Sequence, residues 1–304
     1  MELRQLRYFV TVAEEGNFTR AAARLHLAQP GLSAQIRQLE RELGQPLLDR
    51  GGRTVTLTEV GAAVLPHAWA ALAATDRVAG VVAEFTGLLR GHVRVGLISG
   101  AAGEEFDVAA VLAAFHTDHP AVAISLVEDT SERMLAALDR GELDIAVVGL
   151  TGAESGAGLG AQIVLDTPVV AAVAAGDPEL GDSVALAELR DRPLICLPRG
   201  SGVRGVLELA CAAAGFEPQV AFEAAAPPLL LRLAAHGLGV AVVPGLTGSE
   251  AAAHGVRVVP IERPALRGRL ALVWRTDRTP APATKVLLGQ LRLALGNGSS
   301  DSEQ

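Results

Sequence analysis

The first residues suited to chemistry form a polar row near the N-terminus. Gln29, Ser33 and Arg37 are spaced at i, i+4 and i+8, so they share one face of a helix. Glutamine can pair with the edge of adenine, serine with bases or phosphates, and arginine with guanine or phosphate. Pro30 lies beside them. The row is a candidate surface for contacts with DNA bases, although any solvated helix also carries polar residues on its outer face.

A second candidate surface is a pair of arginines beside a predicted turn. Residues 46–57, PLLDRGGRTVTL, favour a hairpin in which Gly51-Gly52 makes the turn. Arg50 and Arg53 flank that turn. In a winged helix-turn-helix the wing presents such arginines to the DNA backbone or minor groove. An exposed arginine is common on any hairpin, so this assignment depends on the neighbouring helices.

Three small hydroxylated pairs stand where a predicted strand gives way to a helix. In open α/β sheets, ligands bind beyond the carboxyl ends of the strands, where helix N-termini direct their N–H groups. Each pair alone is explained as well by helix capping, but three in one cleft favour a small-molecule site. Arg199 and Arg204 nearby would favour a carboxylate or other anion. The pairs are Ser99-Gly100, Thr130-Ser131 and Ser201-Gly202.

The remaining reactive groups form no catalytic pattern. The sequence has no GxSxG elbow, no GxxxxGK phosphate loop and no HExxH, and its seven histidines are scattered without metal-ligand spacing. Cys196 lies in a predicted strand and Cys211 in a predicted helix. A redox pair is conceivable, but buried cysteines are usually inert. We therefore expect no enzyme activity, no catalytic residue, no metal site and no cofactor.

The polar row belongs to a predicted pair of helices near the N-terminus. A first helix carries Leu6, Phe9, Val10 and Ala13 on one face, and Gly16 is placed to end it. The pair itself follows: an alanine-rich helix at residues 19–25, and a helix begun by Gln29-Pro30. Two short helices joined by a tight turn are typical of the helix-turn-helix, in which the second helix enters the major groove of DNA. The buried face of the second helix would consist of Leu32, Ile36, Leu39 and Leu43.

A family resemblance rests on this segment. The opening MELRQLRYFVTVAEEGNFTRAAARLHLAQPGLSAQIRQLERELGQPLLDRGGRTVTLTEVG resembles the N-terminal domain of LysR-type transcriptional regulators almost without a gap. The resemblance implies a sequence-specific regulator that binds double-stranded promoter DNA as a homodimer, with homotetramers common in the family. It implies DNA contacts from Thr19, Gln29, Pro30, Ser33, Arg37, Arg50 and Arg53.

The helix that follows the hairpin is predicted to be long, from Glu59 to about Leu89. Thr58 is a suitable N-cap, and Pro66 should kink or loosen the first turns. Apolar positions recur in steps of four and three residues, a heptad pattern that favours packing against a helix of another chain. The same apolar face could equally pack against its own domain. The resemblance implies a linker and dimerisation helix. The proposed dimerisation residues are Val64, Ala68, Ala71, Val78, Val82 and Phe85.

From residue 91 onwards, predicted strands alternate with predicted helices, which indicates a mostly parallel α/β sheet. The resemblance implies a periplasmic-binding-protein-like effector domain of two lobes with two crossovers. RLALVWR near the end favours a strand that returns to the first lobe. The expected domains are a winged helix-turn-helix at 1–58, a linker helix at 59–90, and an effector domain at 91–296. Lobe I would hold about 91–163 and 267–296, lobe II about 164–266, and 297–304 would be a disordered tail.

Composition and charge set the class of protein. The chain has 304 residues, half of them hydrophobic and one fifth charged, which suits packed domains rather than a membrane protein. Residues 1–60 carry eight arginines and seven acidic residues, a net charge of +1. Because the whole chain has a formal net charge of −8, the remaining residues carry a net charge of −9. No apolar run reaches membrane-span or signal-peptide length. We expect a cytoplasmic regulator that responds to a small anionic effector; the alternative is a solute-binding or enzymatic α/β protein with packing helices at its N-terminus.

Overall fold

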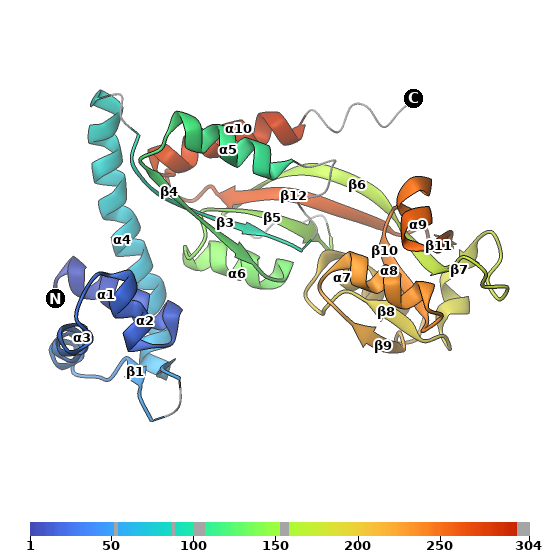
Figure 1. Cartoon of the computed structure of the whole chain (residues 1–304), viewed down its shortest axis with the longest axis horizontal. Coiled ribbons are helices and arrows are strands. Elements are labelled where there is room, and N and C mark those ends of the chain that lie inside the picture. Colours follow the sequence, from blue (N-terminus) through green and yellow to red (C-terminus); the bar gives the residue numbers. More distant parts are fainter. Residues whose placement is uncertain (52–53, 87–88, 100–106, 153–157, 297–304) are drawn as a thin grey trace. The chain divides into compact units, whose positions relative to one another are not determined.

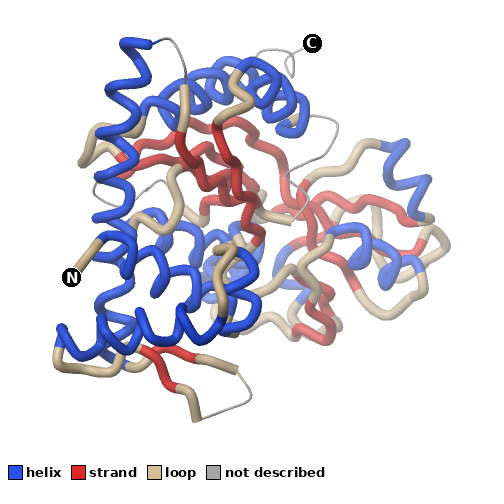
Figure 2. Tube along the Cα trace, turned by 60° about the vertical axis from the view of Figure 1, so that its left-hand side comes forward, coloured by secondary structure: helices blue, strands red, loops and turns tan. Residues whose placement is uncertain are grey.

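The computed structural model describes residues 1–51, 54–86, 89–99, 107–152 and 158–296. The chain divides into two compact units, Met1–Gly91 with Arg140–Glu142, and His92–Asp139 with Leu143–Gln304. The described part of the first unit is mostly helical, and the second is built on strands with helices around them (Figures 1 and 2). No described helix is both long enough and apolar enough to span a bilayer.

Local capping signals define the helices of the first unit. Gly16 ends α1 in the left-handed conformation (φ 56°), and Gly44 ends α3 in the same way (φ 73°). The Asn17 side chain accepts hydrogen bonds from two backbone N–H groups in the first turn of α2. The elements are α1 (Leu3–Glu15), α2 (Phe18–Arg24), α3 (Gln29–Leu43), β1 (Leu48–Asp49), β2 (Thr56–Leu57) and α4 (Glu59–Thr86).

The helix-turn-helix is confirmed, with one correction to its buried stripe. Leu32, Ile36 and Leu39 of α3 are fully buried in a core that also contains Phe9 of α1 and Ala21 of α2. The small alanine side chain lets α2 approach α3 closely. Leu43 is 39% exposed, because it is the last residue of α3 and lies beyond its packed turns.

The hairpin and the start of α4 also follow the sequence signals. β1 and β2 pair antiparallel, with Leu48 opposite Leu57; the predicted turn residues Gly52 and Arg53 lie outside the described residues. The Thr58 hydroxyl accepts a hydrogen bond from the Gly61 N–H at 2.9 Å, which makes Thr58 the expected N-cap of α4. The helix then continues past Pro66 to Thr86.

The first half of the predicted heptad seam of α4 packs within the chain. Ala68 is buried in the core of its own unit, and Val64 and Ala71 pack against the same core. These three residues are therefore occupied within the chain, because the helical face that carries them covers α1. Val78 is 68% exposed and remains available to a partner. Val82 and Phe85 belong to the part of α4 whose side chains are not described.

The second unit consists of two lobes that share one strand, β6 (Leu159–Ala174). Lobe I holds β3 (Gly91–Leu97), α5 (Val108–Asp118), β4 (Val122–Glu128), α6 (Ser131–Arg140), β5 (Ile145–Leu150), β12 (Arg267–Arg275) and α10 (Pro282–Gly296). Lobe II holds β7 (Val184–Ala185), the 3-10 helix η1 (Leu186–Leu189), β8 (Leu194–Cys196), α7 (Gly202–Ala213), β9 (Val220–Glu223), α8 (Pro227–Ala235), β10 (Val240–Pro244), α9 (Gly248–His254) and β11 (Val256–Glu262).

The strands form a continuous but mixed sheet, in the order β4-β3-β5-β12-β6-β10-β8-β9, with β11 beside β6 and β7 beside β11. Residues 159–168 of β6 pair with β12, and its remaining residues pair with β10 and β11. β3 with β5, and β8 with β9 and β10, are parallel. The mostly parallel sheet we expected is thus wrong at the centre, because β6 and β12 carry the chain between lobes and run antiparallel to their neighbours.

Side chains of β6 alternate between the two cores of lobe II. Val169, Ala171 and Val173 face a core shared with η1 and α7, whereas Val170 and Ala172 face a core shared with α8 and α9. Since both faces of the lobe II half of this strand are covered by helices, residues 169–174 are continuously apolar rather than alternating. The two-lobed α/β architecture expected from the sequence is confirmed.

Candidate DNA-binding face and ligand cavity

The outer side of α3 is a polar, exposed face. Gln29, Pro30 and Arg37 are exposed and Ser33 is partly exposed, because the opposite side of the helix carries the buried leucines and isoleucine. Thr19, also exposed, lies in the first turn of α2, where its N–H donates to the Asn17 side chain at 2.8 Å. The structure therefore keeps the four predicted positions of α3 accessible on one rigid helix.

One carboxylate connects α3 to the hairpin. Glu40 Oε1 accepts hydrogen bonds from the N–H groups of Leu47 and Leu48, at 3.0 and 3.2 Å, and its Oε2 pairs with Arg50 at 2.7 Å. The Arg50 guanidinium also lies 5.1 Å from the centroid of the Phe18 ring. Arg50, predicted to contact DNA, is therefore held in place by its own domain.

Sequence reasoning missed Glu40. Its partners lie seven to ten residues further along the chain, so no helical spacing reveals the interaction. Glu40 fixes the start of the hairpin relative to the helix that carries the polar row. The second predicted wing residue, Arg53, lies outside the described residues.

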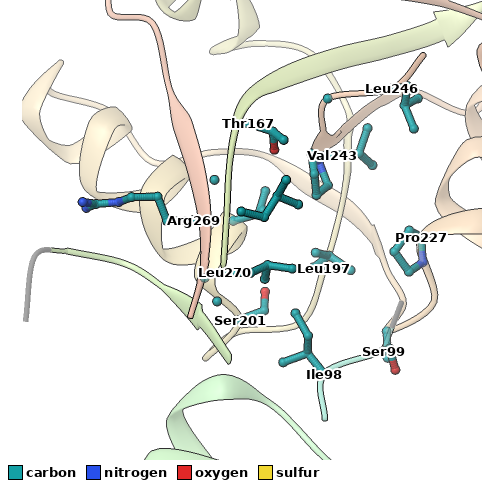
Figure 3. Close-up of a pocket in the computed structure, with 18 of the residues that line it drawn as sticks. Ile98, Ser99, Thr167, Leu197, Ser201, Pro227, Val243, Leu246, Arg269 and Leu270 are labelled. Atoms are coloured by element: carbon teal, nitrogen blue, oxygen red, sulfur yellow. The ribbon is translucent and has the colours of Figure 1, made fainter. Parts of the chain in front are cut away.

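A cavity of about 960 Å³ lies between the two lobes of the second unit (Figure 3). This volume is at the upper end of the range for small-molecule sites. The lining comes from strand ends and helix starts of both lobes, as the topology of open α/β sheets predicts. Its apolar members include Ile98, Leu165, Leu197, Pro227, Leu231, Val243, Leu246 and Leu270, and its hydroxylated members are Ser99, Thr130, Thr167, Ser201, Thr247 and Ser249.

Four predicted effector residues line this cavity: Ser99, Thr130, Ser201 and Gly202. Gly100 lies outside the described residues. Ser131 is wrong as a lining residue. Its side chain is buried, and its hydroxyl accepts a hydrogen bond from the N–H of Gly149 at 2.9 Å, so it supports the end of β5 instead.

Arg204 is also wrong as an effector residue. Its side chain is only 4% exposed; its Nε lies 2.9 Å from Glu208 and its Nη1 3.6 Å from Glu223. Glu208 follows one turn later on α7 and draws the guanidinium away from the cavity. Arg199 is 79% exposed and also pairs with Glu208. The two arginines expected to favour an anion are therefore not among the lining residues.

The lobes touch through backbone at the edge of the cavity. A Cβ atom built on Gly202 would lie 2.6 Å from the carbonyl carbon of Gly149, closer than any side chain tolerates. The Glu132 N–H donates to the Gly200 carbonyl at 3.0 Å across the same contact. Gly202 lines the cavity because only a glycine lets α7 approach β5 so closely.

Thr167 is a lining residue that the sequence did not reveal. Its Oγ1 is buried and has no hydrogen-bond partner among the described residues. It sits in β6 at the point where the strand passes from lobe I to lobe II, and Figure 3 shows its hydroxyl on the cavity side. A buried hydroxyl without a partner carries a free-energy cost, so it marks a place where a ligand can donate or accept a hydrogen bond.

The cysteines and acidic residues offer no redox or metal chemistry in the described residues. Cys196 and Cys211 are free and buried in one core of lobe II. Burial raises the pKa of Cys196 to about 12 and that of Cys211 to about 11, so both thiols stay protonated at neutral pH. Within the described ranges, no cluster of histidine, cysteine, aspartate or glutamate is suited to a metal ion.

Comparisons with known families agree with this architecture. Residues 3–62 match the bacterial regulatory helix-turn-helix protein, lysR family, and residues 86–296 match the LysR substrate binding domain. The chain is 35% identical over 278 residues to the transcriptional regulator BudR of Raoultella terrigena, covering 90% of this chain and 95% of that protein. It is 33% identical over 307 residues to IlvR of Caulobacter vibrioides, covering 99% of each.

A third relative and two solved structures extend the likeness. A probable hydrogen peroxide-inducible genes activator of Mycobacterium avium is 34% identical, over 90% of this chain and 87% of that protein. A full-length OxyR variant of Pseudomonas aeruginosa superposes with a TM-score of 0.66 at 26% identity, over 96% of this chain and 95% of that one. CbnR, a LysR family regulator, does so with a TM-score of 0.63 at 25% identity, over 99% and 100%.

Proposed function

Because the chain belongs to the LysR family of transcriptional regulators, we propose that it binds promoter DNA through the outer face of α3 and is controlled by a small molecule in the cavity of its second unit. The observation that carries the proposal is the exposed polar face of α3 on a rigid, buried stripe. A solved complex of CbnR with its target DNA supports the same use of the fold.

On this proposal α3 lies in the major groove. Gln29, Ser33 and Arg37 read base edges, and Pro30 packs at the start of the helix. Thr19 at the start of α2 contacts a phosphate through its exposed hydroxyl, because threonine hydroxyls hydrogen-bond phosphate oxygens. Arg50 and Arg53 contact the DNA backbone from the hairpin, with Glu40 setting the position of Arg50.

The regulator acts as a homodimer or homotetramer. Two copies of α3 then enter successive major grooves about 34 Å apart. Val78, which is exposed on α4, supports an interface along the second half of that helix; Val82 and Phe85 extend the same seam. Val64, Ala68 and Ala71 are left out of this interface, because they pack within the chain.

The cavity couples the ligand to DNA binding. A ligand changes the arrangement of the copies only if it binds one arrangement more tightly than the other.

We place the regulator in the cytoplasm, where promoter DNA lies, and assign it no enzyme activity. Support for the latter is that the relatives BudR and IlvR are named as transcriptional regulators.

Selection from a random library of duplex DNA tests the function directly. The full chain should enrich a sequence with two half-sites, and Arg37→Ala should weaken binding to that sequence by about 1–3 kcal/mol while changing binding to random duplex much less. Arg7→Ala, a matched loss of one exposed arginine from α1, is the control and should leave selectivity unchanged. Failure to enrich any sequence over random competitor would favour the alternative, a solute-binding or enzymatic α/β protein.

A further inference from the structure

The cavity wall is mainly apolar. Leucine, isoleucine, valine and proline side chains of both lobes are the largest group of lining residues, 12 of 27, and the polar groups are chiefly hydroxyls. Burying apolar ligand surface against such a wall stabilises the complex in proportion to the area removed from water. The wall therefore favours a ligand with a substantial apolar body.

The charged residues of the described lining are mostly acidic. Glu128, Asp129 and Glu250 line the cavity, and Arg269 is the single basic residue among the lining residues that the structure describes. Figure 3 shows the Arg269 side chain directed away from the other lining side chains. Hydrogen bonds from the backbone and side chain of Thr247 lower the pKa of Glu250, so this carboxyl stays ionised. A ligand carboxylate would meet like charge in this cavity.

Helix N-termini usually compensate such repulsion, but at α6 and α9 the N–H group just before the helix already has a carboxylate acceptor. Asp129 accepts the N–H of Thr130, and Glu250 accepts the N–H of Thr247, each at 2.7 Å, at the starts of α6 and α9. α8 begins with Pro227-Pro228, which have no N–H to donate. The start of α7 is closed by the contact of Gly202 with Gly149. The chain thus uses or removes several of the donors that would hold an anion.

One buried polar group of the lining has no hydrogen-bond partner among the described residues. The buried Thr167 hydroxyl, in the same wall, can both donate and accept a hydrogen bond and does neither among the described residues. A hydroxyl or carbonyl oxygen on the ligand would satisfy it.

From these observations we infer that the cavity binds an uncharged, largely apolar molecule bearing a hydroxyl or carbonyl group that hydrogen-bonds Thr167, rather than a carboxylate. This inference replaces the anionic effector expected from the sequence, since the arginines behind that expectation point elsewhere. It rests on the proposed function, because it names the class of molecule that controls DNA binding.

Two series of ligands test the inference; within each series the apolar body is the same and only the polar group changes. Titration calorimetry on the full chain would compare cyclohexylmethanol with cyclohexanecarboxylate and cyclohexylmethylammonium, and biphenylmethanol with its carboxylate and ammonium counterparts. In at least one series the alcohol should bind at least about tenfold more tightly than either ion. A carboxylate or ammonium that binds most tightly in both series would overturn the inference, and so would the absence of binding by both alcohols.

The hydroxyl of Thr167 is tested by an isosteric change. Thr167→Val should weaken the better alcohol by about three- to tenfold and leave the corresponding hydrocarbon (methylcyclohexane or methylbiphenyl) unaffected. Thr117→Val, on the exposed surface of α5, is the matched control and should change neither affinity. Equal affinity of wild type and Thr167→Val for the alcohol would also overturn the inference.

The DNA selection described above, done on the same preparation, separates the two conclusions. A chain that selects DNA but prefers the carboxylate refutes only the ligand class. A chain that binds the alcohol but selects no DNA refutes the proposed function instead.

Discussion

The first unit takes most of its candidate contact residues from one face of one 15-residue helix, whereas the second assembles its cavity from strand ends and helix starts spread over residues 98–270. In α3 the polar side chains are exposed because the apolar stripe takes the opposite face. Around the cavity, many polar groups are already paired within the chain, as Ser131 and Arg204 are.

This difference shows what decides whether a polar residue is free to act. On a single helix, spacing alone separates buried from exposed positions. In a cavity between lobes, a residue distant in the sequence can pair with a polar side chain that would otherwise be free to bind a ligand. The residues most useful for ligand binding are therefore those that the fold leaves without a partner, as it leaves Thr167.

The largest effect is expected where the second unit depends on backbone contact. Gly202→Ala places a methyl group 2.6 Å from the Gly149 carbonyl carbon, so the lobes must separate. Because the clash is with backbone, we expect a cost of about 3 kcal/mol in the free energy of unfolding, at the upper end for overpacking. Calorimetric unfolding of the full chain measures it.

Gly289→Ala is the matched control, because it lies within α10 with no atom in reach of the added methyl. It should be neutral, or stabilising by up to about 1 kcal/mol. Equal stability of the two variants would show that the lobes are not held at this contact.

A smaller effect is expected at the corresponding anchor of the first unit. Glu40→Ala removes the acceptor of the Leu47 and Leu48 N–H groups and the partner of Arg50. We expect a loss of about 2 kcal/mol in the free energy of unfolding.

Glu40→Gln keeps an acceptor oxygen but no charge, and should lose only about 1 kcal/mol. Both variants should weaken DNA binding through the hairpin. Glu217→Gln on the exposed surface of lobe II is the control. If Glu40→Ala unfolds like that control, Glu40 does not anchor the hairpin.

The smallest effect is expected at the buried thiols. At neutral pH, native Cys196 and Cys211 should resist iodoacetamide and form no disulfide with peroxide, whereas urea should expose both to labelling. Their pKa values are raised from 9.0 to about 12 and about 11, so the folded chain keeps protons that the unfolded chain releases. The contribution to the unfolding free energy is therefore constant below pH 9.0 and falls as pH rises above it.

Rapid labelling of the native chain would show an accessible thiolate and would reopen a redox role. Cys211→Ala, labelled in parallel, would identify which thiol reacts.

The helices of the first unit could be predicted because their signals are local. Gly16 and Thr58 act at the ends of the helices they limit, and the stripe of α3 lies within three turns. The exposure of Leu43 could not be read from spacing, since it depends on where neighbouring helices end. Glu40 was missed because its partners arrive only when the hairpin folds back.

The cavity could be placed from the sequence but not assigned in detail. Ser99, Thr130 and Ser201 follow from the rule that ligands bind at strand ends. The error at Arg204 had an available signal, since Glu208 at i+4 is a natural partner on the same helix. The role of Thr167 had none, because its missing partner is a property of packing.

The long shared strand β6 has a mechanical consequence. Its 16 residues run unbroken from one lobe to the other, hydrogen-bonded first to β12 and then to β10 and β11. Rotation of one lobe against the other must therefore twist these hydrogen-bonded strands, because no flexible loop joins the lobes along β6. The register irregularity of β12 at Leu270/Ala271, beside the cavity, interrupts the ladder locally. We therefore expect the lobes to rotate against each other only through small angles, and a ligand between them to favour one of these angles.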